Sequence, residues 1–210
     1  MNKRGILVVV SGFSGAGKGT LMKRLVEKYS QYALSVSATT RPPRQDEVHG
    51  REYFFHTVKE FERLIAEEKL FEFARYVNNY YGTPKQYVEE QLEAGKDVIL
   101  EIEIQGALKV KEQISDTLLI FVTPPNIEEL KCRLTRRGTE ANEVLESRLN
   151  RAVQEAEGMY LYDYLLVNDE LEECVDQMHM IIQSTHNEIR RNKEYIKMLK
   201  NDLEVYRKGE

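Results

Sequence analysis

The chain has 210 residues and a net charge of −5, with 35 acidic and 30 basic side chains. This length allows one domain with inserts, large enough for a core without disulfides or a structural metal, and the acidic excess argues against nucleic acid as a partner. Cys132 and Cys174 lack metal-ligand spacing, and no apolar run reaches the roughly 18 residues of a membrane span. We expect a soluble cytoplasmic protein with reduced cysteines and no membrane contact.

The first predicted element is an apolar strand over residues 6–10, which leads into a glycine-rich loop and then a helical pattern. In such a unit the backbone N–H groups and the helix N-terminus bind phosphate, and Lys18 reaches the outer phosphates. The unit therefore predicts a nucleoside triphosphate site. Its predicted residues are Gly12, Ser14, Gly15, Ala16, Gly17, Lys18, Gly19 and Thr20.

One position departs from the strict form of this loop. Gly19 follows Lys18 where the pattern has a Ser or Thr that binds magnesium, and Thr20 comes next. Magnesium would then depend on Thr20, on water and on more distant carboxylates. Glu101, at the end of a predicted buried strand, is a candidate that would act through water; its alternative role is an ordinary strand-end carboxylate.

Strands and helices alternate along the rest of the chain. Further strands are predicted over residues 33–37, 53–55, 71–77, 80–83, 97–102, 117–122 and 164–167. Helical patterns cover residues 61–65, 108–114 and 127–136. The alternation predicts an α/β fold in which helices cover both faces of a parallel sheet and ligands bind at the carboxyl ends of the strands.

The order of these elements divides the chain into a core and additions. We assign the core to residues 1–37 and 96–183, with a lid at about 136–148. Residues 38–95 form a small mixed insert, which begins near a loop with two prolines. Residues 184–210 form a C-terminal helical extension.

Two stretches of the insert carry a specific resemblance. Residues 35–44 (SVSATTRPPR) and 47–55 (EVHGREYFF) resemble the nucleoside monophosphate-binding signature of guanylate kinase. Further matches are Glu72 and residues 79–83, 101–106, 137–140 and 167–169, so that the similarity covers roughly residues 5–183. The resemblance implies a P-loop NTPase fold and a magnesium-dependent transfer of the ATP γ-phosphate to GMP, with dGMP as a second candidate acceptor.

The resemblance also implies the residues of the acceptor site. Arg41, Arg44, Tyr53 and Tyr81 would hold the phosphate of GMP, while Ser37, Glu72, Thr83 and Glu103 would contact the base. Guanine presents the donors N1–H and the 2-amino group, which carboxylates accept and which adenine lacks on that edge. Glu103 stands where the family usually has Asp, so its carboxylate reaches one methylene further.

Arginines are expected to stabilise the charge that spreads over a transferring phosphoryl group. Arg133, Arg137 and Arg148 match the lid arginines of the family and would act with Lys18 and Arg41 in a direct in-line transfer, with closure excluding water. Arg136 and Arg151 match less clearly. An alternative for the arginines at the helix end is to complement the helix dipole. Asn168 matches the adenine-side loop.

The C-terminal extension shows a different pattern. From Leu171 to Tyr206 apolar residues recur at spacings of four and three, which is the period of a coiled coil. We predict one helix over residues 170–207 that forms a homodimer, with Asn192 setting the register. The alternative is that only its first half packs on the core, because Thr185 and Asn192 interrupt the apolar seam.

Two other functions fit part of this pattern. A non-catalytic guanylate kinase-like module would bind a phosphorylated peptide, but it would not need Lys18 or the lid arginines. A related kinase for a phosphorylated sugar would not need the groups that read a base, such as Ser37, Glu72 and Thr83.

Overall fold

A five-stranded parallel sheet forms the centre of the molecule in the computed structural model, which describes residues 4–76, 78–136 and 142–207. The strand order is β2-β7-β1-β8-β9. The strands are β1 (Leu7–Gly12), β2 (Tyr32–Leu34), β7 (Asp97–Glu101), β8 (Leu118–Thr123) and β9 (Tyr164–Val167). The predicted α/β fold with a parallel sheet is therefore confirmed.

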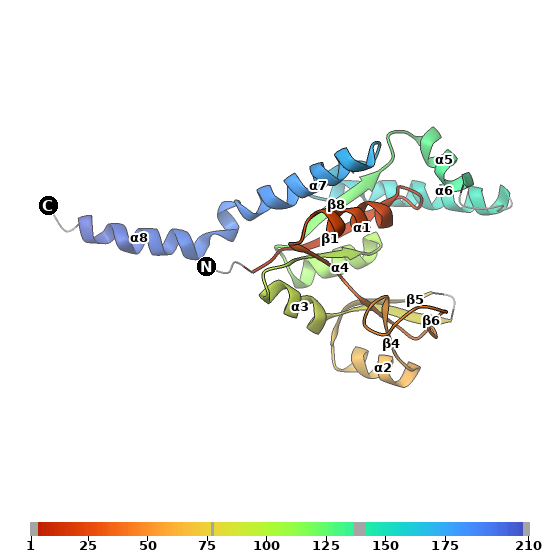
Figure 1. Cartoon of the computed structure of the whole chain (residues 1–210), viewed down its shortest axis with the longest axis horizontal. Helices are drawn as coiled ribbons and strands as arrows, with labels where there is room; N and C mark the ends of the chain where they lie inside the picture. The colour runs from red at the N-terminus through yellow and green to blue at the C-terminus, as the bar shows by residue number, and fades with distance from the viewer. Residues whose placement is uncertain (1–3, 77, 137–141, 208–210) are drawn as a thin grey trace.

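Side chains of β1 alternate between two hydrophobic cores, as successive residues of a strand must. Val8 and Val10 pack on the side of α1 (Lys18–Lys28) and α7 (Leu171–His186). Leu7 and Val9 pack on the side of α3 (Lys85–Glu93) and α4 (Ile104–Gln113). These helices lie on opposite sides of the sheet (Figure 1), which explains why residues 7–10 of β1 are all apolar.

A second, four-stranded sheet has the order β4-β3-β6-β5 and lies apart from the first (Figure 1). Its strands are β3 (Ser37–Thr39), β4 (Tyr53–Phe55), β5 (Leu70–Tyr76) and β6 (Asn79–Pro84). Helix α2 (Val58–Ala66) begins at a capping box of Thr57 and Glu60 and packs Phe61 against this sheet.

Up to residue 117, the sequence-based elements need three corrections. The strand predicted over residues 33–37 ends at Leu34 instead, because the chain passes from the large sheet to the small one there: Ser35 still bonds to Ile99, whereas Ser37 pairs with Tyr53. Helix α3 was not predicted. Helix α4 begins at Ile104 rather than at residue 108, because Gly106 hides the start of its helical pattern.

Helices α5 (Ile127–Arg136) and α6 (Asn142–Glu157) follow β8 in the chain and lie side by side. A short turn of 3₁₀ helix, η1 (Met159–Leu161), returns the chain to β9. The predicted lid therefore falls on the junction of α5 and α6, and Arg137 lies outside the described residues.

The C-terminal region is not one helix. Helix α7 buries Cys174, Val175, Met178, Ile182 and Thr185 against the core. It ends at His186, and the 3₁₀ turn η2 (Ile189–Arg191) separates it from α8 (Lys193–Arg207).

The predicted unbroken helix over residues 170–207 is therefore wrong. The side-chain amide of Asn192 donates to the carbonyls of His186 and Glu188, at 2.9 and 2.8 Å, and these bonds stabilise the break. Helix α8 buries none of its side chains and projects from the body (Figure 1). Within the part of the chain described here, no helix combines the length and apolarity needed to cross a bilayer.

Candidate active site

The glycine-rich loop joins the carboxyl end of the central strand β1 to α1. Gly17 adopts the left-handed conformation with φ of 87°, and a Cβ at this position would lie 2.5 Å from the side-chain nitrogen of Asn168. Any other residue would therefore be strained and would collide with Asn168. Asn168 in turn donates from that nitrogen to the carbonyl of Ala16 at 2.8 Å, which ties the end of β9 to the loop.

Lys18 is the first residue of α1, and its ammonium group lies over the loop. Nζ donates to the carbonyls of Gly12 and Phe13 at 2.7 and 3.0 Å. The loop lines a cleft of about 460 Å³ together with Tyr53, residues 101–104 and two side chains of α6. Gly19 lines this cleft, whereas Thr20 is exposed and does not.

Glu101 lies beside the loop at the end of β7. A Cβ on Gly19 would be 3.8 Å from Glu101 Oε2, so this carboxylate faces the start of α1. The described residues contain no cluster of three or more His, Cys, Asp or Glu side chains suited to holding a metal. A single carboxylate such as Glu101 beside a phosphate site fits Mg²⁺. This ion keeps several waters and is commonly held by one or two carboxylates and by the phosphates of a nucleotide.

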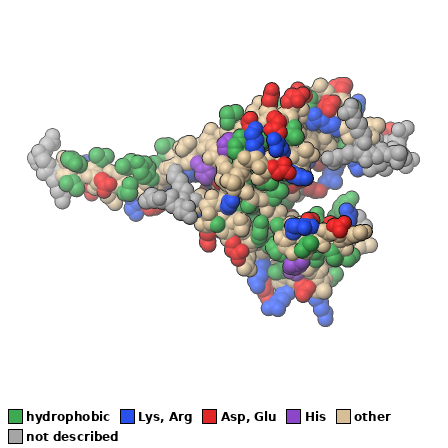
Figure 2. Space-filling view, viewed as in Figure 1, with side chains coloured by type: hydrophobic (Ala, Val, Ile, Leu, Met, Phe, Trp, Pro, Cys, Tyr) green, Lys and Arg blue, Asp and Glu red, His purple; other side chains and the backbone are tan. Residues whose placement is uncertain are grey.

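A second pocket of about 340 Å³ adjoins the cleft. It is lined by the small sheet and by the first turn of α4, and it shares Tyr53, Glu101, Ile102 and Glu103 with the cleft of the glycine-rich loop. Figure 2 shows a hollow at the right of the view, between the part with α5 and α6 and the small sheet, which opens to solvent. A group bound in one pocket would therefore face a group bound in the other.

Glu72 is the most enclosed carboxylate of the second pocket. The hydroxyl of Thr83 donates to its Oε1 at 2.7 Å. Burial raises the pKa of Glu72, and the bond from Thr83 and the charge of Lys109 oppose this effect. Thr83 itself is buried and does not line the pocket, so in this structure it orients Glu72.

Three of the four side chains predicted to hold a phosphate lie together. The guanidinium of Arg41 is 5.4 Å from the ring centre of Tyr53, and the ring centres of Tyr53 and Tyr81 are 6.1 Å apart. Arg44 is exposed, but its backbone N–H donates to Glu47 Oε2 at 2.7 Å, and Glu47 Oε1 accepts from Arg41 at 2.9 Å.

Glu47 thus braces the loop that carries Arg41 and Arg44, and sequence reasoning missed this role. Its hydrogen bond to Arg41 raises the pKa of that arginine. The signal was available, because Glu47 follows Arg44 by three residues in a turn-forming stretch.

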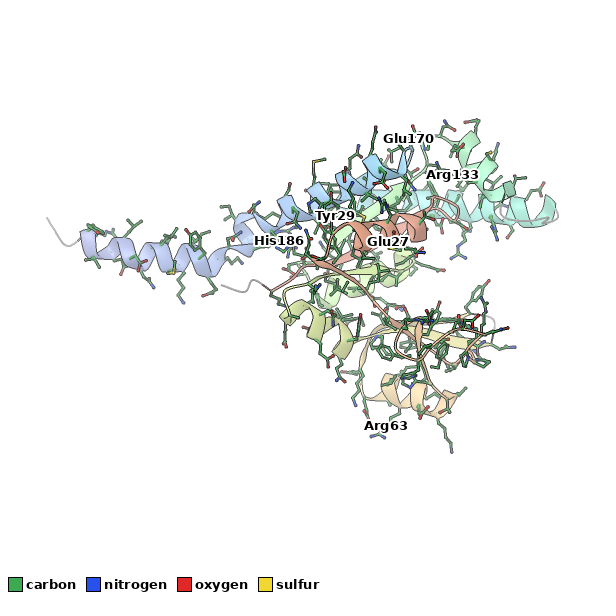
Figure 3. All side chains as sticks on the ribbon, in the orientation of Figure 1. Glu27, Tyr29, Arg63, Arg133, Glu170 and His186 are labelled. Atoms are coloured by element: carbon green, nitrogen blue, oxygen red, sulfur yellow. The ribbon has the colours of Figure 1, made fainter. Side chains whose placement is uncertain are left out.

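Arg133 of α5 lies close to the glycine-rich loop (Figure 3). Its guanidinium donates to Glu129 at 2.7 Å and to the backbone carbonyl of Asn168 at 2.9 Å. A Cβ on Gly17 would be 3.9 Å from Arg133 Nη1. The structure therefore brings Arg133, Asn168 and the loop together, while Arg148 is partly buried on α6.

Comparison with known proteins agrees with this geometry. A family model described as guanylate kinase matches residues 4–185. The chain belongs to the guanylate kinase family.

Two relatives match almost the whole chain. A guanylate kinase of Oceanobacillus iheyensis is 49% identical over 97% of this chain and 99% of that protein. A guanylate kinase of Lactococcus lactis subsp. lactis is 47% identical over 98% of this chain and 100% of that protein. The crystal structure of guanylate kinase from Anaplasma phagocytophilum is 31% identical, covers 90% of each chain and has a TM-score of 0.70.

Two further residues of this guanylate kinase family member reach the cleft from α6. Glu155 lines it beside the loop; burial raises the pKa of Glu155, and the charges of Arg151 and Lys18 oppose this effect. Arg151 contacts Glu155 one turn away and Glu103 across the cleft. Their spacing of four residues, which is about one turn of a helix, was the only sequence signal for this pair.

Proposed function

We propose that this member of the guanylate kinase family transfers the γ-phosphate of ATP to GMP, with ADP and GDP as products. The observation that carries the proposal is the junction of two pockets at Tyr53, Glu101, Ile102 and Glu103, one containing the glycine-rich loop and the other a carboxylate for a base. dGMP is a second candidate acceptor, because the proposed base and phosphate contacts do not involve the 2′-hydroxyl.

The proposed donor site is the glycine-rich loop with Asn168. Backbone N–H groups of residues 12–20 would bind the phosphates of ATP, and Lys18 would exchange its carbonyl partners for phosphate oxygens. Asn168 would lie at the adenine side, because it already contacts the loop at Ala16. We retain Thr20 in this site as a prediction, although it is exposed here.

The proposed acceptor site divides into a phosphate part and a base part. Arg41, Arg44, Tyr53 and Tyr81 would bind the phosphate of GMP, since a guanidinium and phenol hydroxyls are suitable donors. Ser37, Glu72, Thr83 and Glu103 would determine the choice of base, with Glu72 accepting from N1–H and Thr83 keeping Glu72 oriented.

We propose a direct in-line transfer without a covalent enzyme intermediate. Lys18, Arg41 and the lid arginines Arg133, Arg137 and Arg148 would neutralise the charge that spreads over the transferring group. Closure of a lid at about residues 136–148 onto the insert, residues 38–95, would exclude water that could otherwise hydrolyse ATP. Mg²⁺, held near Glu101 and Thr20 through water, would neutralise charge on the ATP phosphates.

Two further properties belong to the proposal. We propose a cytoplasmic location. The free thiols of Cys132 and Cys174 support it, because such thiols are usual in reducing compartments. We also propose a homodimer formed by the extension at residues 184–210. Because α7 packs on the core up to His186, we assign the dimer contact to α8.

The deciding experiment measures ADP formation from ATP and magnesium with GMP, dGMP, AMP, CMP, UMP or ribose 5-phosphate as acceptor. We expect activity with the guanine nucleotides only, and its loss in Lys18→Met. Lys23→Met, on the exposed side of the same helix, is the matched control and should keep full activity. Binding of GMP or a phosphopeptide without ADP formation would favour the non-catalytic module; activity with ribose 5-phosphate would favour the sugar kinase.

A further inference from the structure

Glu103 occupies an unusual place among the side chains of the site. It lines the cleft of the glycine-rich loop, the acceptor pocket and a third cavity of about 910 Å³ between α4 and α6. It is the residue immediately before α4, which places its backbone at the N-cap of that helix. The direction taken by its carboxylate therefore decides which of these spaces receives the negative charge.

The carboxylate of Glu103 does not cap its own helix. Short acidic side chains at an N-cap normally accept a hydrogen bond from a backbone N–H in the first turn, but Glu103 makes no such bond. Its Oε1 accepts instead from Arg151 of α6. The additional methylene of Glu, compared with Asp, thus takes the carboxylate away from its own helix and toward α6.

Arg151 lies between two carboxylates. Its Nη2 donates to Glu103, and its Nε donates to Glu155 Oε1 at 3.3 Å. Burial lowers the pKa of Arg151, but the bond to Glu103 and the charges of Glu103 and Glu155 outweigh this effect and raise it. Arg151 and Glu155 also line the cleft of the glycine-rich loop, so this chain of charges connects the two nucleotide sites.

Stability does not explain the pair. The side chains of Arg151 and Glu103 are 46% and 75% exposed, and ion pairs this exposed contribute little to folding. The contact joins residues 48 positions apart in sequence, on two separate walls of the cleft. A role in the site accounts for it better than a role in the fold.

We propose that Arg151 is a positioning residue that holds the Glu103 carboxylate at the mouth of the acceptor pocket, where it accepts a hydrogen bond from the 2-amino group of guanine. Arg151 thereby contributes to the preference for GMP over IMP, whose base lacks that amino group. This inference rests on the proposed guanylate kinase activity. It concerns Arg151 of this chain, which acts on the base only through Glu103.

The test compares kcat/KM for GMP and for IMP in the wild type and in Arg151→Gln, which keeps much of the side-chain length and removes the charge. We expect the preference for GMP over IMP to fall about 3- to 10-fold, the range for loss of a partly exposed charge-assisted hydrogen bond. The change should arise in KM for GMP, and KM for IMP should change by less than about twofold.

A double-mutant cycle separates positioning from direct contact. Asp at position 103 does not reach α6, so in the Glu103→Asp background the Arg151→Gln change should alter the GMP/IMP preference by less than about twofold. Arg63→Gln is the matched control: Arg63 also pairs with a Glu four residues later, but it lies on α2 and points away from the molecule (Figure 3). It should leave the preference unchanged.

Three outcomes would overturn the proposal. They are an unchanged GMP/IMP preference in Arg151→Gln, an equal loss for both nucleotides, and an effect of Arg151→Gln that persists in Glu103→Asp. A loss for both nucleotides would mean that Arg151 contacts phosphate. If the wild type phosphorylates neither nucleotide, the proposed function fails; calorimetric titration of the same variants with GMP and IMP then decides the positioning role without turnover.

Discussion

At the scale of single residues, Glu72 shows how the site sets binding against stability. Its carboxylate is enclosed by the small sheet and α4, and burial raises its pKa. The hydroxyl and the backbone of Thr83 and the charge of Lys109 favour the ionised form. An ionised acceptor kept in such surroundings is typical of a binding site, because the fold alone would be better served by a neutral side chain.

Glu72→Gln should therefore separate the two properties. We expect KM for GMP to rise about 10- to 100-fold, because a hydrogen bond to a charged group is lost, while the melting temperature stays equal or rises. Steady-state kinetics and thermal unfolding measure the two effects. Glu62→Gln, an exposed change on α2, is the control; a lower melting temperature with an unchanged KM would contradict the assignment of Glu72 to the base.

The raised pKa of Glu72 also predicts the pH dependence of GMP binding. Protonation removes an acceptor, so KM for GMP should rise as the pH falls, starting at a higher pH than for a carboxyl group with the ordinary value of 4.5. The stability effect has the opposite sense: the folded state binds this proton more tightly, so the contribution of Glu72 to folding decreases as the pH rises through its raised pKa. KM profiles for GMP and ATP, with Glu72→Gln for comparison, test this; a parallel rise of both KM values would contradict it.

Residue types predicted the proposed donor site more directly than the proposed acceptor site. The glycine-rich loop is contiguous, so its letters and spacing determined the prediction of Lys18 and its neighbours. Thr83 acts on Glu72 through a contact between two strands that no local pattern records. Arg151 joins Glu103 only because α6 folds back over the cleft, which sequence spacing alone could not place.

At the scale of elements, the end of α7 is fixed by a buried polar contact. Asp97 at the start of β7 is 2% exposed, and its Oδ1 accepts from the backbone N–H of Ile6 at 2.8 Å. His186, the last residue of α7, lies 2.9 Å from the same oxygen (its position is labelled in Figure 3). One carboxylate thus joins the N-terminal segment, the central sheet and the last core helix.

Asp97→Ala should destabilise the protein by about 3 kcal/mol, because it leaves the buried Ile6 N–H without an acceptor and removes the partner of His186. Urea unfolding measures the loss. Asp202→Ala on the exposed α8 is the control and should change the free energy of unfolding by less than about 0.5 kcal/mol. Equal effects of the two substitutions would show that the Asp97 contacts contribute nothing.

The hydrophobic pattern predicted the elements whose solvent exposure is uniform along their length. It gave wrong boundaries where a segment moves from one sheet or one surface to another. The apolar strands β1, β7 and β8 were correctly placed, since both of their faces are buried. The apolar stretch at residues 33–37 was assigned to one strand, although it passes from one sheet to the other. The heptad pattern at the C-terminus hid a helix break that depends on the folded contacts of Asn192.

At the scale of the whole molecule, α8 projects from the body (Figure 2), although Glu194 and Tyr195 in its first turn line a pocket with the N-terminal segment. Exposed hydrophobic side chains lie along it. They include Tyr195, Met198, Leu199, Leu203, Val205 and Tyr206. A helix of 15 residues that buries none of its side chains is only marginally stable in water, so a partner surface would stabilise it, and its heptad spacing favours a second copy of the same helix.

Removing residues 193–210 should therefore convert a dimer into a monomer. The cut leaves Asn192, which holds the end of α7, so the core should keep its melting temperature and kcat within about twofold. Light scattering of the full and shortened chains gives their masses. A monomeric full-length chain, or a shortened chain that stays dimeric, would contradict the proposal.

The place of β1 in the sheet has a consequence for synthesis. Its two neighbours are β7 and β8, and Leu7 pairs with Val98 while Val8 pairs with Leu118. Translation at roughly 5–20 residues per second leaves this apolar strand without its neighbours for on the order of 5 to 20 s after it is made. The glycine-rich loop cannot take its final shape until then, so ATP can assist folding only late. Nascent chains stalled before β7 are therefore the form most exposed to aggregation.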